Sequence, residues 1–386
     1  GRINYEALYG RYEPDALVLS VGDREEKWGD YFYLLFTQCG QIEDYFDSMS
    51  AYYGMRFTWN DPIEEEENSE TFADAALESA ENLMIQLRAL ELLAEESGVE
   101  VSEEMRAMIE EEKQTAIAST VGEEGSEEEF YSYLETIHLS REMYDRTVTQ
   151  NFLYQESFNR LYGEGAVNLS DEEALSWLEE NGYVAAAHIL FQNRDLTTGE
   201  ALTDEQKEEK KAELEALAEE LRAIEDPAER KEAFLAKMAE VSEDTGKSYY
   251  PEGYTFTSGT MVQPFDTAAR ALDEYAVSDL VETDYGWHIL LRLPLNPDGI
   301  VEFSDSTGEA RTGRMLAANR QYSDKLQAVA DELSVTWLTE DGAPEGGPPD
   351  FRKPADVAQV VLWLCSDEAA YVNGNVVTAD GGMDII

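Results

Sequence analysis

The chain contains three histidines, and two of them, His188 and His288, lie in the middle of short apolar segments. Each segment has the length and composition of a buried β-strand, so both imidazoles are expected to be at least half-buried and to need hydrogen-bond partners. Buried titratable side chains that lie together are typical of functional sites, although a single histidine in a strand is more often a satisfied core residue. The third, His138, lies in a helical pattern without a partner motif, and we interpret it as structural.

Three short motifs between the two histidines carry the other candidate residues. In chain order these are Asp244, Met261, Phe265, Thr283 and Tyr285. A carboxylate such as Asp244 could equally belong to a helix end or a turn. Met261 and Phe265 would be core residues in any fold.

The elements that must position these residues predict a small α+β domain. Val184–Gln192 and Trp287–Leu293 have the pattern of strands. Between them, a capping sequence at Thr203 and the Asp226-Pro227 pair each start a charged helix, and a shorter helix is expected at about 264–272.

Both flanks of this domain are predicted to be mainly helical. A strand at Ala16–Val21 precedes a helix at Trp28–Tyr53, and leucine-rich helical spacing continues from about residue 71 to the helix that starts at the capping box of Ser170. Gly313–Leu333 is predicted to be a helix that packs back onto the N-terminal helices. We therefore expect four parts: 1–182, 183–296, 297–341, and a linker with a tail at 342–386.

The motifs around the two histidines resemble those of the parvulin family of peptidyl-prolyl cis/trans isomerases. They read A-x-HIL, S-x-D, G-x-M-x-x-x-F-x-x-A-x-x-AL and V-x-T-x-x-G-x-H-I-L, in this order. The acidic, helix-rich flanks are similar to bacterial foldases and chaperones of the PrsA and SurA type. The resemblance implies a helical chaperone-like domain with an inserted parvulin domain, whose antiparallel sheet is flanked by helices, plus a short C-terminal appendage.

The resemblance implies a prolyl isomerase that assists the folding of exported proteins. It implies that His188 and His288 pair across the sheet through hydrogen bonds that include Thr283, and that Asp244 lies beside the reacting carbonyl. Rotation about an X–Pro bond needs no nucleophile, cofactor or metal, because polar groups that favour the twisted amide in a partly dry site are sufficient.

The resemblance also implies a proline pocket formed by Met261 and Phe265, with Tyr285 at its rim. Tyr285 stands where some relatives carry a small residue, and Tyr249–Gly253 replaces the usual glycine-rich stretch, so the rim is expected to differ. The loop after the first strand carries only Arg194, which disfavours a preference for phosphorylated substrates. A chaperone that binds unfolded clients through its helical domain, with a non-catalytic parvulin unit, is the alternative.

The last residues resemble the C-terminal end of a short-chain dehydrogenase/reductase. The match covers the segments Pro354–Gly374 and Val376–Gly382, which correspond to only the last helix and strand of that family, and Ala355–Cys365 is the helix candidate. A glycine-rich cofactor turn and a Tyr-x-x-x-Lys pair are both absent from the sequence, so oxidoreductase activity is only a third hypothesis. We interpret the tail as a fusion or an assembly artefact without activity.

Composition limits the partners. With 83 acidic and 28 basic residues the net charge is −55, which argues against nucleic acid and anionic membranes. Two cysteines without metal-ligand spacing support neither a disulfide framework nor a zinc site. We expect unfolded or partly folded polypeptide clients and leave dimerisation open. The resemblance implies an extracytoplasmic location, in the cell envelope or secreted, and the start at Gly1 suggests that an upstream signal or anchor is missing from this chain.

Overall fold

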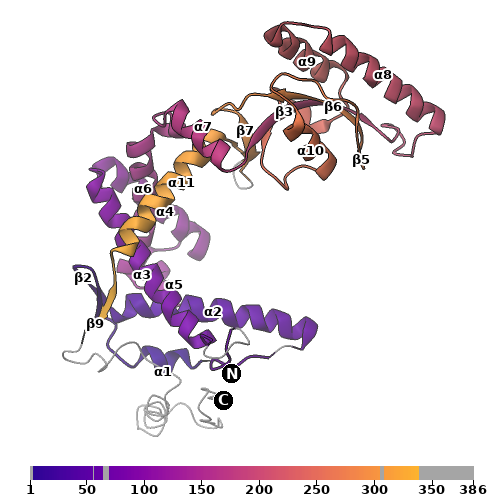
Figure 1. Ribbon diagram of the computed structural model, residues 1–386. Coiled ribbons are helices and arrows are strands. Elements are labelled where there is room, and N and C mark those ends of the chain that lie inside the picture. Colours follow the sequence, from indigo (N-terminus) through magenta and orange to yellow (C-terminus); the bar gives the residue numbers. More distant parts are fainter. Residues whose placement is uncertain (1–2, 55, 64–68, 305–307, 339–386) are drawn as a thin grey trace. The chain divides into compact units, whose positions relative to one another are not determined.

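The computed structural model describes residues 3–54, 56–63, 69–304 and 308–338 (Figure 1). These residues divide into two compact units. Unit 1 contains the described residues up to 160 together with those from 324 onward, and unit 2 contains Leu161–Ser323. The predicted boundaries at 182 and 296 both fall inside unit 2, and they stay predictions. The predicted linker and tail lie outside the described residues.

Unit 1 is mainly helical. Its helices are α1 (Tyr5–Tyr9), α2 (Trp28–Tyr53), α3 (Phe72–Glu96), α4 (Glu103–Val121), α5 (Glu127–Glu135) and α6 (Arg141–Tyr162), the last of which ends just beyond the boundary. The core combines aromatic residues of α2 with small and aliphatic residues of α3, and its largest fully buried side chains include Trp28, Trp59 and Tyr31. The aromatic residues in the first half of α2 are thus core residues, whereas Tyr45, Tyr52 and Tyr53 in its second half are exposed.

Unit 1 also contains a small antiparallel sheet. Its strands, in the order β2-β1-β9, are β2 (Arg24–Lys27), β1 (Leu17–Val21) and β9 (Val335–Trp337). Leu19 pairs with Trp337, whose indole donates to a carboxylate oxygen of Glu81 over 3.0 Å and meets Tyr31 edge-on at 5.1 Å. The chain therefore returns to unit 1 after it has completed unit 2.

Unit 2 is an α+β domain, which confirms the predicted fold class. Its sheet has the order β4-β3-β6-β5 and is antiparallel throughout. The strands are β3 (Val184–Gln192), β4 (Tyr254–Phe256), β5 (Val281–Thr283) and β6 (Gly286–Leu293). A second ribbon pairs β7 (Ile300–Phe303) with β8 (Ala310–Thr312).

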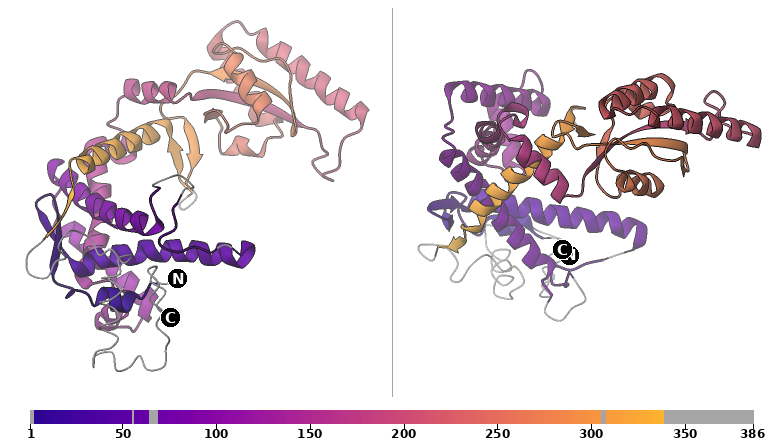
Figure 2. Two further views of the ribbon diagram at one scale, coloured as in Figure 1. Left: turned by 60° about the horizontal axis from the view of Figure 1, so that its bottom comes forward. Right: turned by 45° about the horizontal axis from the view of Figure 1, so that its top comes forward.

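Helices cover both faces of the four-stranded sheet. They are α8 (Asp204–Arg222), α9 (Pro227–Val241) and α10 (Gln263–Ala271). The other helices are α7 (Asp171–Glu180) and α11 (Gly313–Asp331), which ends in unit 1, with short 3₁₀ turns η1 (Glu164–Ala166) and η2 (Thr245–Ser248). Alternate residues of β3 from Ala185 to Phe191 share one core with α8 and α9, while Val184 and Ala186 share another with α10. Figure 1 and the right-hand view of Figure 2 show these helices on opposite sides of the sheet.

Local sequence explains the ends of these helices. Thr71, Ser126, Ser170 and Thr203 each form a capping box with the residue three positions on. Asp226 accepts hydrogen bonds from two backbone N–H groups of α9, whose first residue is Pro227. The caps at Thr203 and Asp226 fix where α8 and α9 begin.

The turn between β5 and β6 requires glycine. Gly286 has φ 142°, and a Cβ at this position would lie 2.2 Å from the carbonyl oxygen of Phe191. Any side chain here would therefore separate β6 from β3. This close approach fixes the register in which Leu190 lies opposite His288.

Candidate active site

His188 and His288 lie side by side on the face of the sheet that α10 covers. His188 is in β3 and His288 in the neighbouring β6, and the two residues are only 6% and 4% exposed. The two Nδ1 atoms are 3.0 Å apart, and the rings are stacked with centroids 5.2 Å apart. Each imidazole is therefore the partner that burial of the other requires.

Asp244 lies at the other edge of His188. It follows α9, and its Oδ2 is 3.1 Å from Nε2 of His188. Its Oδ1 accepts a hydrogen bond from the backbone N–H of Gly246 over 3.0 Å, which makes Asp244 the N-cap of η2. Asp244 is therefore a turn residue, and the same carboxylate also contacts His188, so its place in the turn is compatible with a role in the site.

Thr283 extends the chain of hydrogen bonds on the side of His288. Its Oγ1 is 2.8 Å from Nε2 of His288 and accepts from the backbone N–H of Tyr285 over 3.2 Å. The side chain of Tyr285 is turned outward, with 63% of the residue exposed.

The predicted pocket residues lie on α10 and just before it. Phe265 is buried, and its ring meets His188 and His288 edge-on with centroid distances of 5.1 and 5.7 Å. Met261 packs half-buried against the same core as Phe265. The structure therefore brings His188, His288, Asp244, Thr283 and Phe265 together, with Met261 beside them.

The donors and acceptors of this chain of hydrogen bonds follow from the carboxylate. Ionised Asp244 can only accept, so Nε2 of His188 carries a hydrogen and, with the ring neutral, its Nδ1 accepts. Nδ1 of His288 then donates to His188, and Nε2 of His288 accepts from the hydroxyl of Thr283. Every polar atom in the chain has a partner while both imidazoles are neutral.

Electrostatics agree with this assignment. Burial is the largest influence on Asp244 and favours its neutral form, but hydrogen bonds from His188, Tyr254 and the backbone of Gly246 prevail and hold the pKa of this carboxyl well below its usual range. Burial, assisted by the neighbouring His188, lowers the pKa of His288 to about 3. At neutral pH the site thus holds Asp244 as a carboxylate and His288 as a neutral imidazole.

One residue of the site was missed by sequence reasoning. Tyr254 begins β4, and its hydroxyl donates to Oδ2 of Asp244 over 2.7 Å. Burial and the adjacent carboxylate raise the pKa of Tyr254 well above its usual range, so it remains a donor. Its ring stacks on Tyr250 with centroids 4.4 Å apart. The signal in the sequence is the tyrosine-rich loop that begins at Tyr249, whose pattern indicates only a changed rim.

Comparison with known proteins identifies this domain. Residues 188–293 match the family model of the PPIC-type PPIASE domain, and residues 347–384 match that of Enoyl-(Acyl carrier protein) reductase. The chain therefore carries a PPIC-type peptidyl-prolyl isomerase domain in unit 2, which confirms the predicted resemblance to parvulins. The predicted resemblance of the tail to a reductase is also confirmed.

Individual relatives match parts of the chain. Chaperone SurA of Methylococcus capsulatus is 32% identical over 80 residues, which are 21% of this chain and 15% of that protein. The 3-oxoacyl-[acyl-carrier-protein] reductase FabG of Thermotoga maritima is 28% identical over 163 residues, 40% of this chain and 62% of that protein. The chain thus spans less than two thirds of either. The solved PrsA of Bacillus subtilis is 17% identical, with 71% of this chain and 91% of that chain covered and a TM-score of 0.26.

Proposed function

We propose that this protein is a peptidyl-prolyl cis/trans isomerase that assists protein folding. The observation that carries the proposal is the continuous chain of hydrogen bonds from Thr283 through both histidines to Asp244. The ring of Phe265 packs against both histidines, and these residues lie in the segment that matches the PPIC-type family. This arrangement supports an apolar grip on a proline ring next to an ionised carboxylate.

The proposed mechanism is differential stabilisation of the twisted amide. An X–Pro bond resists rotation because its C–N bond has partial double-bond character, with a barrier of about 20 kcal/mol. In the twisted state the nitrogen becomes pyramidal and the carbonyl loses its resonance, so a fixed polar group beside it lowers the barrier. We assign that role to Asp244. His188, His288, Thr283 and Tyr254 would hold its position and charge.

Met261, Phe265 and Tyr285 are assigned to substrate binding in the same proposal. Phe265 would form the floor under the proline ring, with half-buried Met261 as a wall. The exposed ring of Tyr285 lies two residues after Thr283, where it can cover the residue before proline. A flat aromatic surface of this kind suits several side chains.

A preference for unphosphorylated bonds is part of the proposal. Two lysines of unit 2 are engaged by other groups: Lys247 donates to the carbonyls of Ala239 and Ser242, and Lys210 pairs with Glu243 at 2.7 Å. A phosphate would need unengaged cations at the rim.

We propose unfolded or partly folded polypeptides as clients, and an extracytoplasmic location, in the cell envelope or secreted. The match of one segment to Chaperone SurA supports both. In the described residues, no helix combines the length and the apolar composition needed to cross a membrane.

The test is the cis-to-trans rate of a short unphosphorylated Ala–Pro peptide with the intact chain. We expect acceleration by the wild type and at least about a tenfold loss of kcat/KM in Asp244→Ala and His188→Ala, since a positioned polar group contributes at least this much. Asp273→Ala, an exposed carboxylate of the same domain, should leave the rate unchanged. Circular dichroism would establish that each variant is folded. No acceleration by the wild type would refute the isomerase and favour a non-catalytic chaperone.

A further inference from the structure

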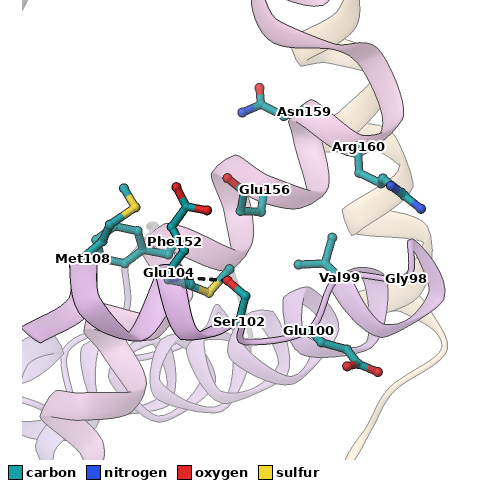
Figure 3. Close-up of a pocket in the computed structure, with 11 residues that line it drawn as sticks. Gly98, Val99, Glu100, Ser102, Glu104, Met108, Phe152, Glu156, Asn159 and Arg160 are labelled. Atoms are coloured by element: carbon teal, nitrogen blue, oxygen red, sulfur yellow. Dashed lines mark hydrogen bonds between the residues drawn. The ribbon is translucent and has the colours of Figure 1, made fainter.

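Unit 1 contains a second pocket, which the isomerase chemistry does not use. It has a volume of about 440 Å³ and lies among the loop after α3, the start of α4 and the second half of α6. Figure 3 shows side chains from these segments around one open space. The volume is within the range of sites that bind small ligands or side chains.

The floor of this pocket is apolar. Phe152 of α6 lines it and packs on the small buried core of Ala94, Met105 and Leu153. Met108 of α4 lines it too, with 49% of its surface exposed. An incoming aliphatic or aromatic side chain would therefore extend an existing core and remove exposed apolar surface from water.

The walls of this pocket are acidic. Glu100, Glu104 and Glu156 line it, and Figure 3 shows Glu104 and Glu156 extending into the space from facing helices. None of the three forms an ion pair within the described part of the chain. The buried Glu26 and half-buried Glu91 of unit 1, by contrast, both pair with Arg146 at 2.8 Å.

We propose that this pocket binds a client segment in which an apolar side chain is flanked by lysine or arginine. The apolar side chain would contact Met108 and Phe152, and the flanking cations would meet Glu104 and Glu156. Arg160 also lines the pocket, but three carboxylates against one guanidinium leave the lining net negative, which favours a cationic occupant. The choice of a polypeptide rests on the proposed function. An unfolded client exposes such sequences, whereas a folded partner buries most of its apolar side chains.

The test uses the intact chain and a fluorescent peptide, Gly-Ser-Lys-Leu-Lys-Phe-Lys-Ser-Gly, measured by anisotropy. The peptide contains no proline, so its binding is independent of isomerisation. We expect binding that weakens with added NaCl, and binding that is lost when the three lysines are replaced by glutamates. Glu104→Gln with Glu156→Gln should weaken binding about two- to fivefold for each charge removed. Met108→Ser should weaken it as well.

The matched control is Glu103→Gln with Glu111→Gln. Both residues are exposed on α4 and neither lines the pocket, so the same charge is removed elsewhere and the affinity should stay within about twofold. Equal losses in the control and the pocket variants would overturn the proposal, because only overall charge would then matter. Self-association of the chain that the pocket variants abolish would also overturn it, by assigning the pocket to a second copy.

The Ala–Pro isomerisation rate separates this proposal from the proposed function. All pocket variants should retain the wild-type rate, because the pocket and the hydrogen-bonded site belong to different units. If the wild type binds the peptide as expected but does not accelerate isomerisation, the isomerase fails and the pocket stands. If the wild type accelerates isomerisation but does not bind the peptide, the isomerase stands and the proposed role of the pocket fails.

Discussion

The charge of a single residue, Asp244, organises the candidate site. Because its carboxylate only accepts hydrogen bonds, it fixes the hydrogen positions on His188, and through them those on His288 and Thr283. The proposed isomerase does not need these histidines to exchange protons with its substrate. In the proposed mechanism His188 holds the carboxylate directly, and His288 acts through His188.

Tyr254→Phe tests how that carboxylate is held. Loss of the hydroxyl removes one donor to Asp244, so the pKa of the carboxyl should rise and the acid limb of the rate–pH profile should move to higher pH. We expect kcat/KM near neutral pH to fall about fivefold, since one hydrogen bond contributes about 1 kcal/mol. Tyr250→Phe, which removes the hydroxyl of the stacked neighbour, is the control. An unchanged acid limb in Tyr254→Phe would contradict the assigned role.

His288 should make stability depend on pH. The unfolded chain protonates this histidine below its ordinary pKa of 6.5, whereas the folded chain keeps it neutral down to about 3. The unfolded state therefore binds more protons between these values, and stability is full above pH 6.5 and is lost as pH falls towards 3. This residue alone should lower the free energy of unfolding by about 2 kcal/mol between pH 8 and pH 5.

Urea unfolding at both pH values measures this effect. His288→Asn keeps a polar side chain without titrating, so its loss between pH 8 and pH 5 should be smaller than that of the wild type. Equal losses in the two proteins would mean that other groups carry the pH dependence.

At the scale of helices and strands, the sequence predicts those elements whose ends are marked by local residues. The bounds of α2 and β3 match the expected ranges, because a cap, a turn or a compact apolar run marks each end. The strands β4, β5, β8 and β9 have three residues each, and no expectation covered them. Strands this short exist only through their partners, so their own residues carry no pattern.

The same contrast applies to the site. His188, Asp244, Thr283 and His288 could be found because motifs carry them, although their roles came from a resemblance. Tyr254 could not, since its contact with Asp244 depends on how β4 pairs with the start of β3.

The cap of α9 should be measurable on its own. Asp226→Ala leaves two backbone N–H groups of the first turn without their acceptor, and we expect a loss of about 1 kcal/mol in the free energy of unfolding. Urea titration of the intact chain, followed through the unfolding of unit 2, measures this loss. Glu225→Ala, an exposed neighbour, should change stability by less than about 0.5 kcal/mol. A loss as large in Glu225→Ala would mean that helix charge rather than capping is responsible.

At the scale of the whole molecule, the described residues form two units with separate cores, and stability should reflect that division. Trp337→Ala removes the indole that contacts Tyr31 and Glu81 in unit 1, and a loss of about 3 kcal/mol is expected. The isomerisation rate, which belongs to unit 2, should not change. Calorimetry should show one transition move to lower temperature, and movement of both transitions would mean that the units unfold together.

The pairing of β1 with β9 also has a consequence for synthesis. A chain that leaves the ribosome from its N-terminus holds β1 with one edge open until Trp337 has emerged, whereas unit 2 is contiguous and available earlier. We expect a nascent chain arrested before residue 324 to display a finished isomerase domain on an unfinished helical unit. The part of this protein proposed to assist folding would then be completed before the part that surrounds it in the sequence.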